Sequence, residues 1–366
     1  MNFQETDEQQ MIREMVRDFA ETVLAPTVEH RDKHQIPPSE AWESFMEFGL
    51  QSITIPEEYG GSPVDDVSEA IIIEELARVD PSFAVMYCVH VGLCSMTIAL
   101  HGDESQKKAY LPRLAAGEVG AYSLSESGAG TDAAAMVCKA KLSDDGTHYV
   151  LNGEKMWVTN GAQAKIIVLF AKDVDHPDYG VKKHGGTTAF IVDASFEGYS
   201  VGKKEDKLGI RSSDTCTLIL NDCKVPVENV LKGVGNGFPI AMNALDNSRI
   251  GIAAQALGIA QGAYEAALKY AHEREAFGPI STIMPYKNLE EAISEKQFEK
   301  IFENLKKNPE KFLNSDLGKI VKEDVSSKIS EFEFSSKFEY NCDCCNKNME
   351  EPEGHLLRTF EILQSK

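Results

Sequence analysis

The chain has 366 residues and a formal net charge of −21, which makes nucleic acid and anionic membrane surfaces poor partners for it. Its 42% hydrophobic and 26% charged residues are typical of a soluble protein with two or three domains. The N-terminus is polar and no long apolar run stands out, so we expect neither an export signal nor a membrane-spanning helix. Five of the eight cysteines lie singly among apolar neighbours, which indicates a reducing, cytoplasmic compartment.

Residues 1–116 are predicted to form an N-terminal helical domain. Apolar residues recur at helical spacing in the first segment, and Pro26 follows this run. Residues 39–50 form a second amphipathic segment, with Ser39 and Gly49 as candidate caps. Two apolar segments that follow are expected to be buried helices.

Residues 117–230 are predicted to form a middle, antiparallel β domain, because the hydrophobic period changes from helical to strand-like. Short apolar runs here each end at Gly, Asn or Asp. Within residues 147–160, the pair Asn152 and Gly153 favours a β-hairpin.

Residues 231–278 are predicted to begin a C-terminal helical bundle. The Ala-rich stretch 237–277 has the pattern of one long helix, in which Gly251, Gly258 and Gly262 indicate close approach to neighbouring helices. The fold class is therefore α+β.

Residues 279–366 form a Lys/Glu-rich, mostly helical tail with no recognisable relation to what precedes it. The tail holds Cys342, Cys344, Cys345 and His355, but their spacing is not the paired spacing of a zinc ribbon or finger. We therefore predict free thiols there and no metal site.

The segment YSLSESGAGTDAAA, residues 122–135, is a polar loop with two glycines. Such a loop can turn backbone N–H groups and the Thr131 hydroxyl toward a phosphate. It is neither a Walker loop nor a GxGxxG turn after a strand, so an ordinary Gly-rich turn is the alternative.

The segment KMWVTNG follows about 25 residues later and carries Trp157 and Thr159. In a strand these two side chains point to the same face. An indole and a hydroxyl on one face suit a flat heteroaromatic ring, the first by stacking and the second by a hydrogen bond to its edge. The alternative is that Trp157 belongs to the core.

Residues 1–277 closely resemble the acyl-CoA dehydrogenase family, and most of all its short-chain (butyryl-type) members. The resemblance rests, in order, on YSLSESGAGTDAA, LNGEKMWVTNG, VGKKEDKLGIRSSDT, VPVENVL and the run from GFPIAMNALDNSR to AHERE. It implies a helical domain, a β domain and a four-helix C-terminal bundle, which is truncated here, in a homo-oligomer. One departure is Ser127, where the family usually has proline.

The resemblance also implies FAD as the cofactor and assigns site residues by position. The positions that bind FAD match Tyr122, Leu124, Ser125, Gly130, Thr131, Trp157 and Thr159, and, toward a neighbouring subunit, Arg274 and Phe277. The positions that bind the acyl-CoA substrate match Thr131, Asp246 and Arg249.

The implied reaction is α,β-dehydrogenation of a short-chain acyl-CoA to the trans-2-enoyl-CoA, with electrons passed to an electron-transfer flavoprotein. A carboxylate removes the α-proton while the flavin accepts a hydride from Cβ. The catalytic residue stays unassigned: the family's Tyr-Glu-Gly-Thr segment is missing, and Ser248 stands before Arg249, where a minority of members carry the base. A carboxylate of the tail, such as Glu290 or Glu291, is one source that stays open.

Residues 275–293, EAFGPISTIMPYKNLEEAI, resemble a second family, the aldehyde dehydrogenases. Glu275 matches that family's glutamate at the nicotinamide ribose. Because that family's dinucleotide domain and catalytic cysteine are missing, the resemblance implies no NAD chemistry. Our hypothesis is that the chain is chimeric and switches families at EAFG.

Two alternatives to the dehydrogenase stay open. The first is a non-enzymatic remnant that binds FAD or acyl-CoA but lacks the catalytic glutamate, which predicts exposed apolar surface on the long helix. The second is a flavin oxidase of related fold, which needs a base and a path for oxygen. Bleaching of the flavin by butyryl-CoA would distinguish the dehydrogenase from the remnant, and release of peroxide would identify the oxidase.

Overall fold

The computed structural model describes residues 4–274, which belong to one compact unit. The first part of this unit is helical, as predicted, and its core is built around the rings of Phe19, Phe45 and Phe83. The helices are α1 (Asp7–Phe19), α2 (Ala25–His34), α3 (Ser39–Met46), α4 (Asp66–Val79), α5 (Pro81–Cys88), α6 (Met96–His101) and α7 (Glu104–Ala115).

Helices α5 and α6, with the π-helical segment Val89–Ser95 between them, form one apolar stretch, Pro81–His101. By length and composition this stretch could cross a membrane, contrary to the expectation from the sequence. Within the protein, however, 72% of its apolar window is buried, as in the core helix of a globular domain. Length and composition are therefore weak evidence of a membrane span here.

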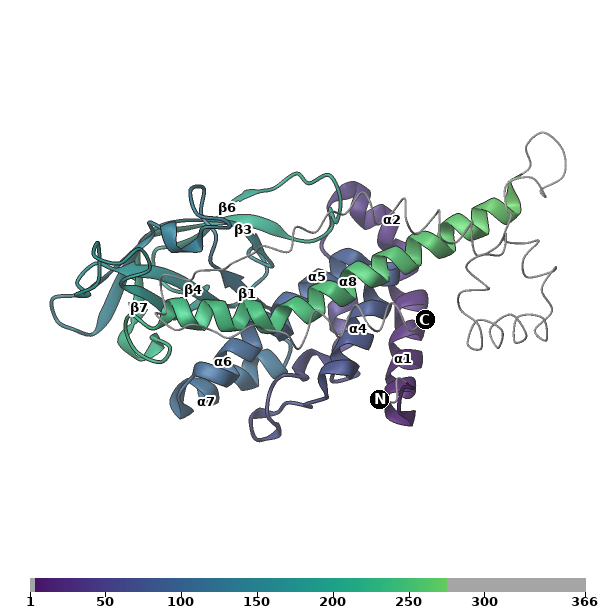
Figure 1. Ribbon diagram of the computed structural model, residues 1–366, viewed down its shortest axis with the longest axis horizontal. Helices are drawn as coiled ribbons and strands as arrows, with labels where there is room; N and C mark the ends of the chain where they lie inside the picture. Colours follow the sequence, from purple (N-terminus) through teal and green to yellow (C-terminus); the bar gives the residue numbers. More distant parts are fainter. Residues whose placement is uncertain (1–3, 275–366) are drawn as a thin grey trace, which may run out of the picture. The chain divides into compact units, whose positions relative to one another are not determined.

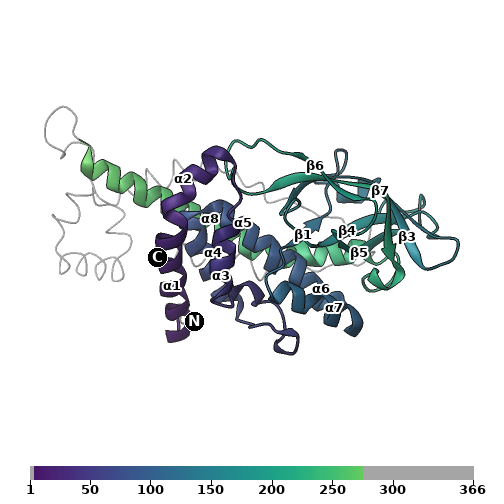
Figure 2. The same cartoon turned by 180° about the vertical axis from the view of Figure 1, so that it is seen from behind.

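The middle part is a seven-stranded sheet (Figures 1 and 2). Its strands are β1 (Gly120–Ser123), β2 (Lys139–Leu142), β3 (His148–Thr159), β4 (Ile166–Asp173), β5 (Thr187–Asp193), β6 (Tyr199–Lys204) and β7 (Thr215–Pro226). They lie in the order β1-β4-β2-β3-β7-β6, and β5 pairs with β4. The sheet is mixed and not purely antiparallel as expected, because β4 runs parallel to both β1 and β2.

The hairpin predicted at Asn152 and Gly153 is wrong. Both residues lie inside β3, which continues past them and pairs with β7 on either side. At Gly153 φ is +152°, and a Cβ there would lie only 2.9 Å from the Cα of Cys138. The glycine therefore permits close approach of the chain that enters β2, and it does not make a turn.

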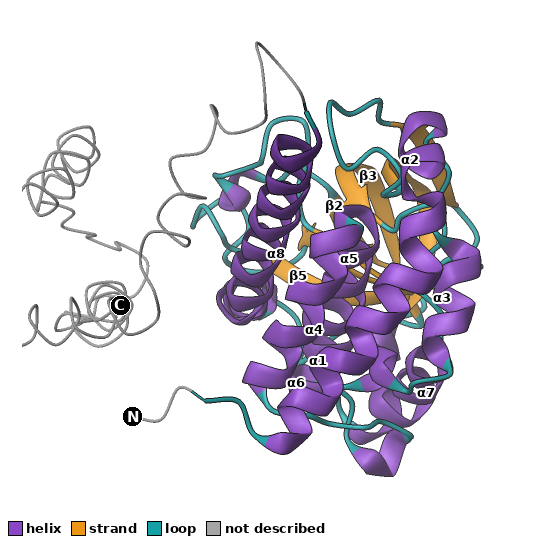
Figure 3. Cartoon of the chain, turned by 90° about the vertical axis from the view of Figure 1, so that its right-hand side faces the viewer, coloured by secondary structure: helices purple, strands orange, loops and turns teal. Residues whose placement is uncertain are grey.

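Helix α8 (Gly237–Glu273) is the long helix that the sequence predicts. It starts beside the sheet and passes over α5 and α4 (Figures 1 and 3). A Cβ at Gly258 would lie 2.2 Å from the carbonyl oxygen of Glu74, and one at Gly262 would lie 2.1 Å from that of Arg78. The predicted close approach is confirmed: α8 meets the backbone of α4 at its glycines.

Candidate functional site

Trp157 is presented by a β-bulge near the end of β3. The pairing register with β7 shifts between Lys155 and Val158, which leaves one extra residue in β3. Trp157 adopts a left-handed backbone conformation, with φ at +56°, that is unfavourable for a bulky residue. Trp157 is 58% exposed and Thr159 is half-buried, whereas Val158 between them is buried. The indole is thus open to solvent and the Thr159 side chain is partly so, while Val158 packs into the core.

The Gly-rich loop lies against this bulge. The backbone N–H of Met156 donates a hydrogen bond to the carbonyl oxygen of Ser125 at 2.9 Å. At the start of the same segment, Tyr122 and Leu124 are buried. The Tyr122 hydroxyl donates a hydrogen bond to the carbonyl oxygen of Ala241 in α8 at 3.4 Å. Strand β1 therefore contacts the first turns of α8, and the loop that follows β1 contacts the bulge.

The second half of the loop faces open space. A Cβ built at Gly128 or Gly130 would meet no atom within 4 Å, and Thr131 is exposed. Within residues 4–274, the backbone N–H groups of Gly130 and Thr131 donate no hydrogen bond. Free N–H groups beside a hydroxyl suit an anion such as a phosphate.

A buried ion pair joins the loop to β3. The Nζ atom of Lys155 lies 2.7 Å from Oε1 of Glu126 and donates a second hydrogen bond to the carbonyl oxygen of Leu124. The Glu126 carboxylate also accepts hydrogen bonds from the backbone N–H groups of Val137 and Cys138. The pair thus holds the loop next to the bulge; the sequence prediction did not include either residue.

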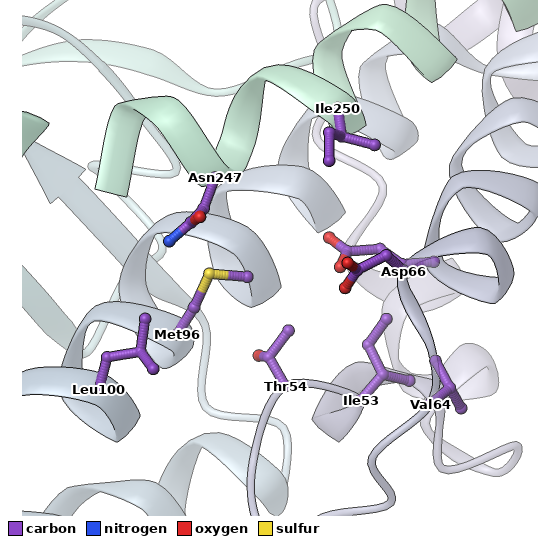
Figure 4. A pocket seen from close by; sticks show the side chains of 9 residues that line it. Ile53, Thr54, Val64, Asp66, Met96, Leu100, Asn247 and Ile250 are labelled. Carbon is purple, nitrogen blue, oxygen red and sulfur yellow. The ribbon is translucent and has the colours of Figure 1, made fainter. Parts of the chain in front are cut away.

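A pocket of about 290 Å³ opens between α4, α6 and α8 (Figure 4). Its walls are polar and apolar in about equal parts, and they carry two carboxylates, from Asp66 and Glu69. Burial raises the pKa of Glu69 to about 7, and the negative charge of Asp66 adds to this shift. The lining residues are Ile53, Thr54, Val64, Asp66, Glu69, Met96, Leu100, Asn247 and Ile250.

The residues predicted to hold CoA lie on the exposed side of α8. Nη1 of Arg249 is 3.1 Å from Oδ1 of Asp246, and both side chains are largely exposed. Ser248 lies between them in sequence and is half-buried, and its hydroxyl donates to the carbonyl oxygen of Leu245. The structure thus brings a cation and an acid together where the sequence predicts substrate contacts.

The remaining predicted residues lie at or beyond the end of the described chain. Nη1 of Arg274 donates to the hydroxyl of Tyr270 at 3.2 Å, at the C-terminus of α8. Phe277, Glu290, Glu291 and the tail cysteines lie outside the described residues. Within residues 4–274, no group of three or more His, Cys, Asp or Glu side chains could hold a metal ion.

Three family models match the chain along most of its length. The N-terminal domain model of acyl-CoA dehydrogenases matches residues 6–118, the middle domain model 121–223 and the C-terminal domain model 235–297. The chain belongs to the acyl-CoA dehydrogenase family.

Similar proteins agree with this assignment. A short-chain specific acyl-CoA dehydrogenase of Clostridium acetobutylicum is 45% identical over 279 residues, which cover 76% of this chain and 72% of that protein. The structure of butyryl-CoA dehydrogenase from Megasphaera elsdenii matches with a TM-score of 0.74 and 40% identity, over 84% of this chain and 80% of that one. A chain from work on the electron transferring flavoprotein of Acidaminococcus fermentans matches with a TM-score of 0.74 and 43% identity, over 82% and 78% of the two chains.

Family membership confirms the predicted enzyme class, an FAD-dependent oxidoreductase acting on a CH–CH bond of acyl-CoA, and the three-part fold. The hypothesis of a chimeric chain is not supported, because the C-terminal domain model extends to residue 297, through the stretch that resembles aldehyde dehydrogenases. That stretch lies outside the described residues. The comparisons also give no support to a catalytically impaired remnant.

The described residues fit FAD. The exposed indole of Trp157 offers a stacking surface for a flat ring system, and the half-buried Thr159 places a hydroxyl two residues further along β3. The free N–H groups of Gly130 and Thr131 suit the pyrophosphate. Tyr122 and Leu124 are buried beneath this region, and their contact with the cofactor stays a prediction.

Proposed function

We propose that this family member dehydrogenates short-chain acyl-CoA thioesters to trans-2-enoyl-CoA. The observation that carries the proposal is the exposed Trp157, held at a bulge beside a loop with free N–H groups, in a chain 45% identical to a short-chain specific relative. A bulky residue in a left-handed conformation persists only where its surroundings enforce it, and such residues cluster at functional sites.

The chain's own groups have separate tasks in this proposal. When bound, FAD supplies the acceptor for the hydride that leaves Cβ. Trp157 and Thr159 orient the ring system, and the loop around Gly130 binds the phosphates. The Arg249 guanidinium, exposed on α8, binds an anionic part of CoA, and Asp246 orients that guanidinium.

We further propose an electron-transfer flavoprotein as the electron acceptor, a homo-oligomer as the assembly and the cytoplasm as the location. The 43% identity to the chain from the work on the Acidaminococcus fermentans electron transferring flavoprotein supports the acceptor. Exposed apolar side chains of α8, among them Ile252, Leu257 and Tyr264, are a surface that another copy could cover.

The proposal predicts a preference for short acyl chains. We expect kcat/KM for butyryl-CoA to exceed that for octanoyl-CoA and palmitoyl-CoA by about tenfold or more, measured with an artificial electron acceptor and with an electron-transfer flavoprotein. A higher value for octanoyl-CoA would contradict the short-chain assignment. Stoichiometric release of peroxide in air, without any other acceptor, would favour the oxidase alternative.

A further inference from the structure

Glu69 places a carboxylate in the pocket between α4, α6 and α8. Its Oε1 atom is 3.6 Å from the position that a Cβ of Gly92 would occupy, and the Cβ of Ser248 is 4.0 Å from the same point. Glu69 and Ser248 therefore both lie close to the point at which a side chain of residue 92 would begin. Because Gly92 has no side chain, the space between the carboxylate and α8 stays open.

The carboxylate has no partner among the described residues. Within residues 4–274 no donor or cation lies within bonding distance of Glu69, whereas Glu75, six residues along α4, binds three arginines. On α5, Tyr87 and Cys88 face Glu69, and burial raises the pKa of both, so they are neutral at pH 7. Asp66 adds a negative charge from α4.

On α8, the charged groups near the pocket are Asp246 and Arg249, which pair with each other. No described cation therefore neutralises Glu69, and its pKa of about 7 reflects burial and the charge of Asp66. A carboxyl that titrates near neutrality is half-ionised at working pH. That is the range in which a general base is most effective.

Helix α8 links this pocket to the predicted flavin site. The Tyr122 hydroxyl bonds to the carbonyl oxygen of Ala241, and Ser248 lies seven residues further along α8. Seven residues are about two turns, so both positions lie on the same helical face, about 10 Å apart along the axis. The predicted flavin contact at Tyr122 and the pocket that holds Glu69 therefore lie along the same helix, about two turns apart.

We propose that Glu69 is the catalytic base of this chain and takes the α-proton of the bound thioester. The bond between Cα and hydrogen breaks, the proton moves to a carboxylate oxygen of Glu69, and the electron pair stays on Cα, delocalised toward the thioester oxygen. The inference rests on the proposed function. It assigns to α4 a role that Ser248 on α8 cannot perform, because a serine hydroxyl is a poor proton acceptor.

Exchange of the α-hydrogens of acetyl-CoA in D2O, followed by mass spectrometry, tests the proposal. Acetyl-CoA has no Cβ, so its exchange reports on proton removal without dehydrogenation. We expect the folded Glu69→Gln variant to lose about 100-fold or more of the exchange rate, while its affinity for acetyl-CoA is retained. In the unmodified chain, exchange rises with pH through about 7, as Glu69 loses its proton.

Asp66→Asn gives a second test that leaves the Glu69 carboxyl in place. The pH profile of exchange should move to lower pH in this variant, because the charge of Asp66 raises the pKa of Glu69. If Glu69→Gln does not fold, the pH profile of exchange in Asp66→Asn tests the proposal instead. A profile identical to that of the unmodified chain would overturn it.

Two further outcomes distinguish a failure of Glu69 as the base from a failure of the proposed function. Wild-type exchange in Glu69→Gln, in a chain that oxidises butyryl-CoA, would show that Glu69 is not the base while the proposed function stands. An unmodified chain that binds both thioesters but neither oxidises butyryl-CoA nor exchanges acetyl-CoA would overturn the proposed function and the base together.

Discussion

Replacement of Lys155 by methionine is expected to lower the free energy of unfolding by about 3–5 kcal/mol, the usual effect of removing one partner of a buried ion pair. Lys155 is fully buried and Glu126 is 3% exposed, so the substitution leaves a carboxylate away from water without its cation. The bond from Lys155 to the carbonyl oxygen of Leu124 is lost as well. Bound FAD per chain should therefore fall, because the loop is no longer held against the bulge.

Urea unfolding, followed by tryptophan fluorescence, measures this effect. Lys224→Met is the matched control, because Lys224 forms its ion pair with Glu197 at the surface, and we expect a much smaller loss than for Lys155→Met. Adding Glu126→Gln to Lys155→Met should restore part of the stability, since the unpaired charge is then removed. Equal effects of Lys155→Met and Lys224→Met would contradict the role of the buried pair.

Gly258→Ala is expected to destabilise the protein by about 3 kcal/mol, at the upper end for overpacking. The new methyl group would lie 2.2 Å from the carbonyl oxygen of Glu74 and 2.8 Å from the Cβ of Ala77, atoms that move only with α4 as a whole. The gain in helix propensity from glycine to alanine, about 1 kcal/mol, is too small to offset this clash. Helix α8 would have to move away from α4.

Gly251→Ala makes the same substitution in the same helix and serves as the control. Its methyl group would lie 3.1 Å from Cδ1 of Ile73, the end of a flexible side chain that can adjust. We expect a change close to zero, measured by the same urea titration. A loss of equal size in both variants would show that glycine conformation, and not contact with the α4 backbone, limits these positions.

Regular periodicity made the helices and the long α8 predictable. The helical spacing of apolar residues located the N-terminal helices, and Gly258 and Gly262 indicated a close contact that the structure confirms. The partner, α4, could not be predicted, because helical spacing says nothing of which distant segment a helix meets.

Local turn chemistry was misleading in β3. Asn152 and Gly153 favour a hairpin, but tertiary pairing with β7 on both sides outweighs that preference. The bulge at Trp157 had no sequence signal either, since it depends on the register between two strands. Strand alternation indicated Trp157 and Thr159 as a surface for a flat ring, and the resemblance assigned that ring to FAD, but neither predicted the bulge.

The charged residues of the site were the hardest to predict. Lys155 in LNGEKMW and Glu126 in SLSESG are 29 residues apart, and only the folded sheet brings them together. Glu69 directly precedes the apolar run Ala70–Ile73, and an acid beside such a run was the one available signal of a buried carboxyl. The sequence shows that these charged residues are present, but it does not show which groups they contact in the folded chain.

The visible spectrum of the purified chain, recorded before and after anaerobic addition of butyryl-CoA, tests most directly whether this chain is a working acyl-CoA dehydrogenase. We expect a flavin absorption band that bleaches as the substrate is oxidised. A flavin band that persists would contradict the proposed dehydrogenation, and a colourless protein would contradict the FAD site at the Trp157 bulge.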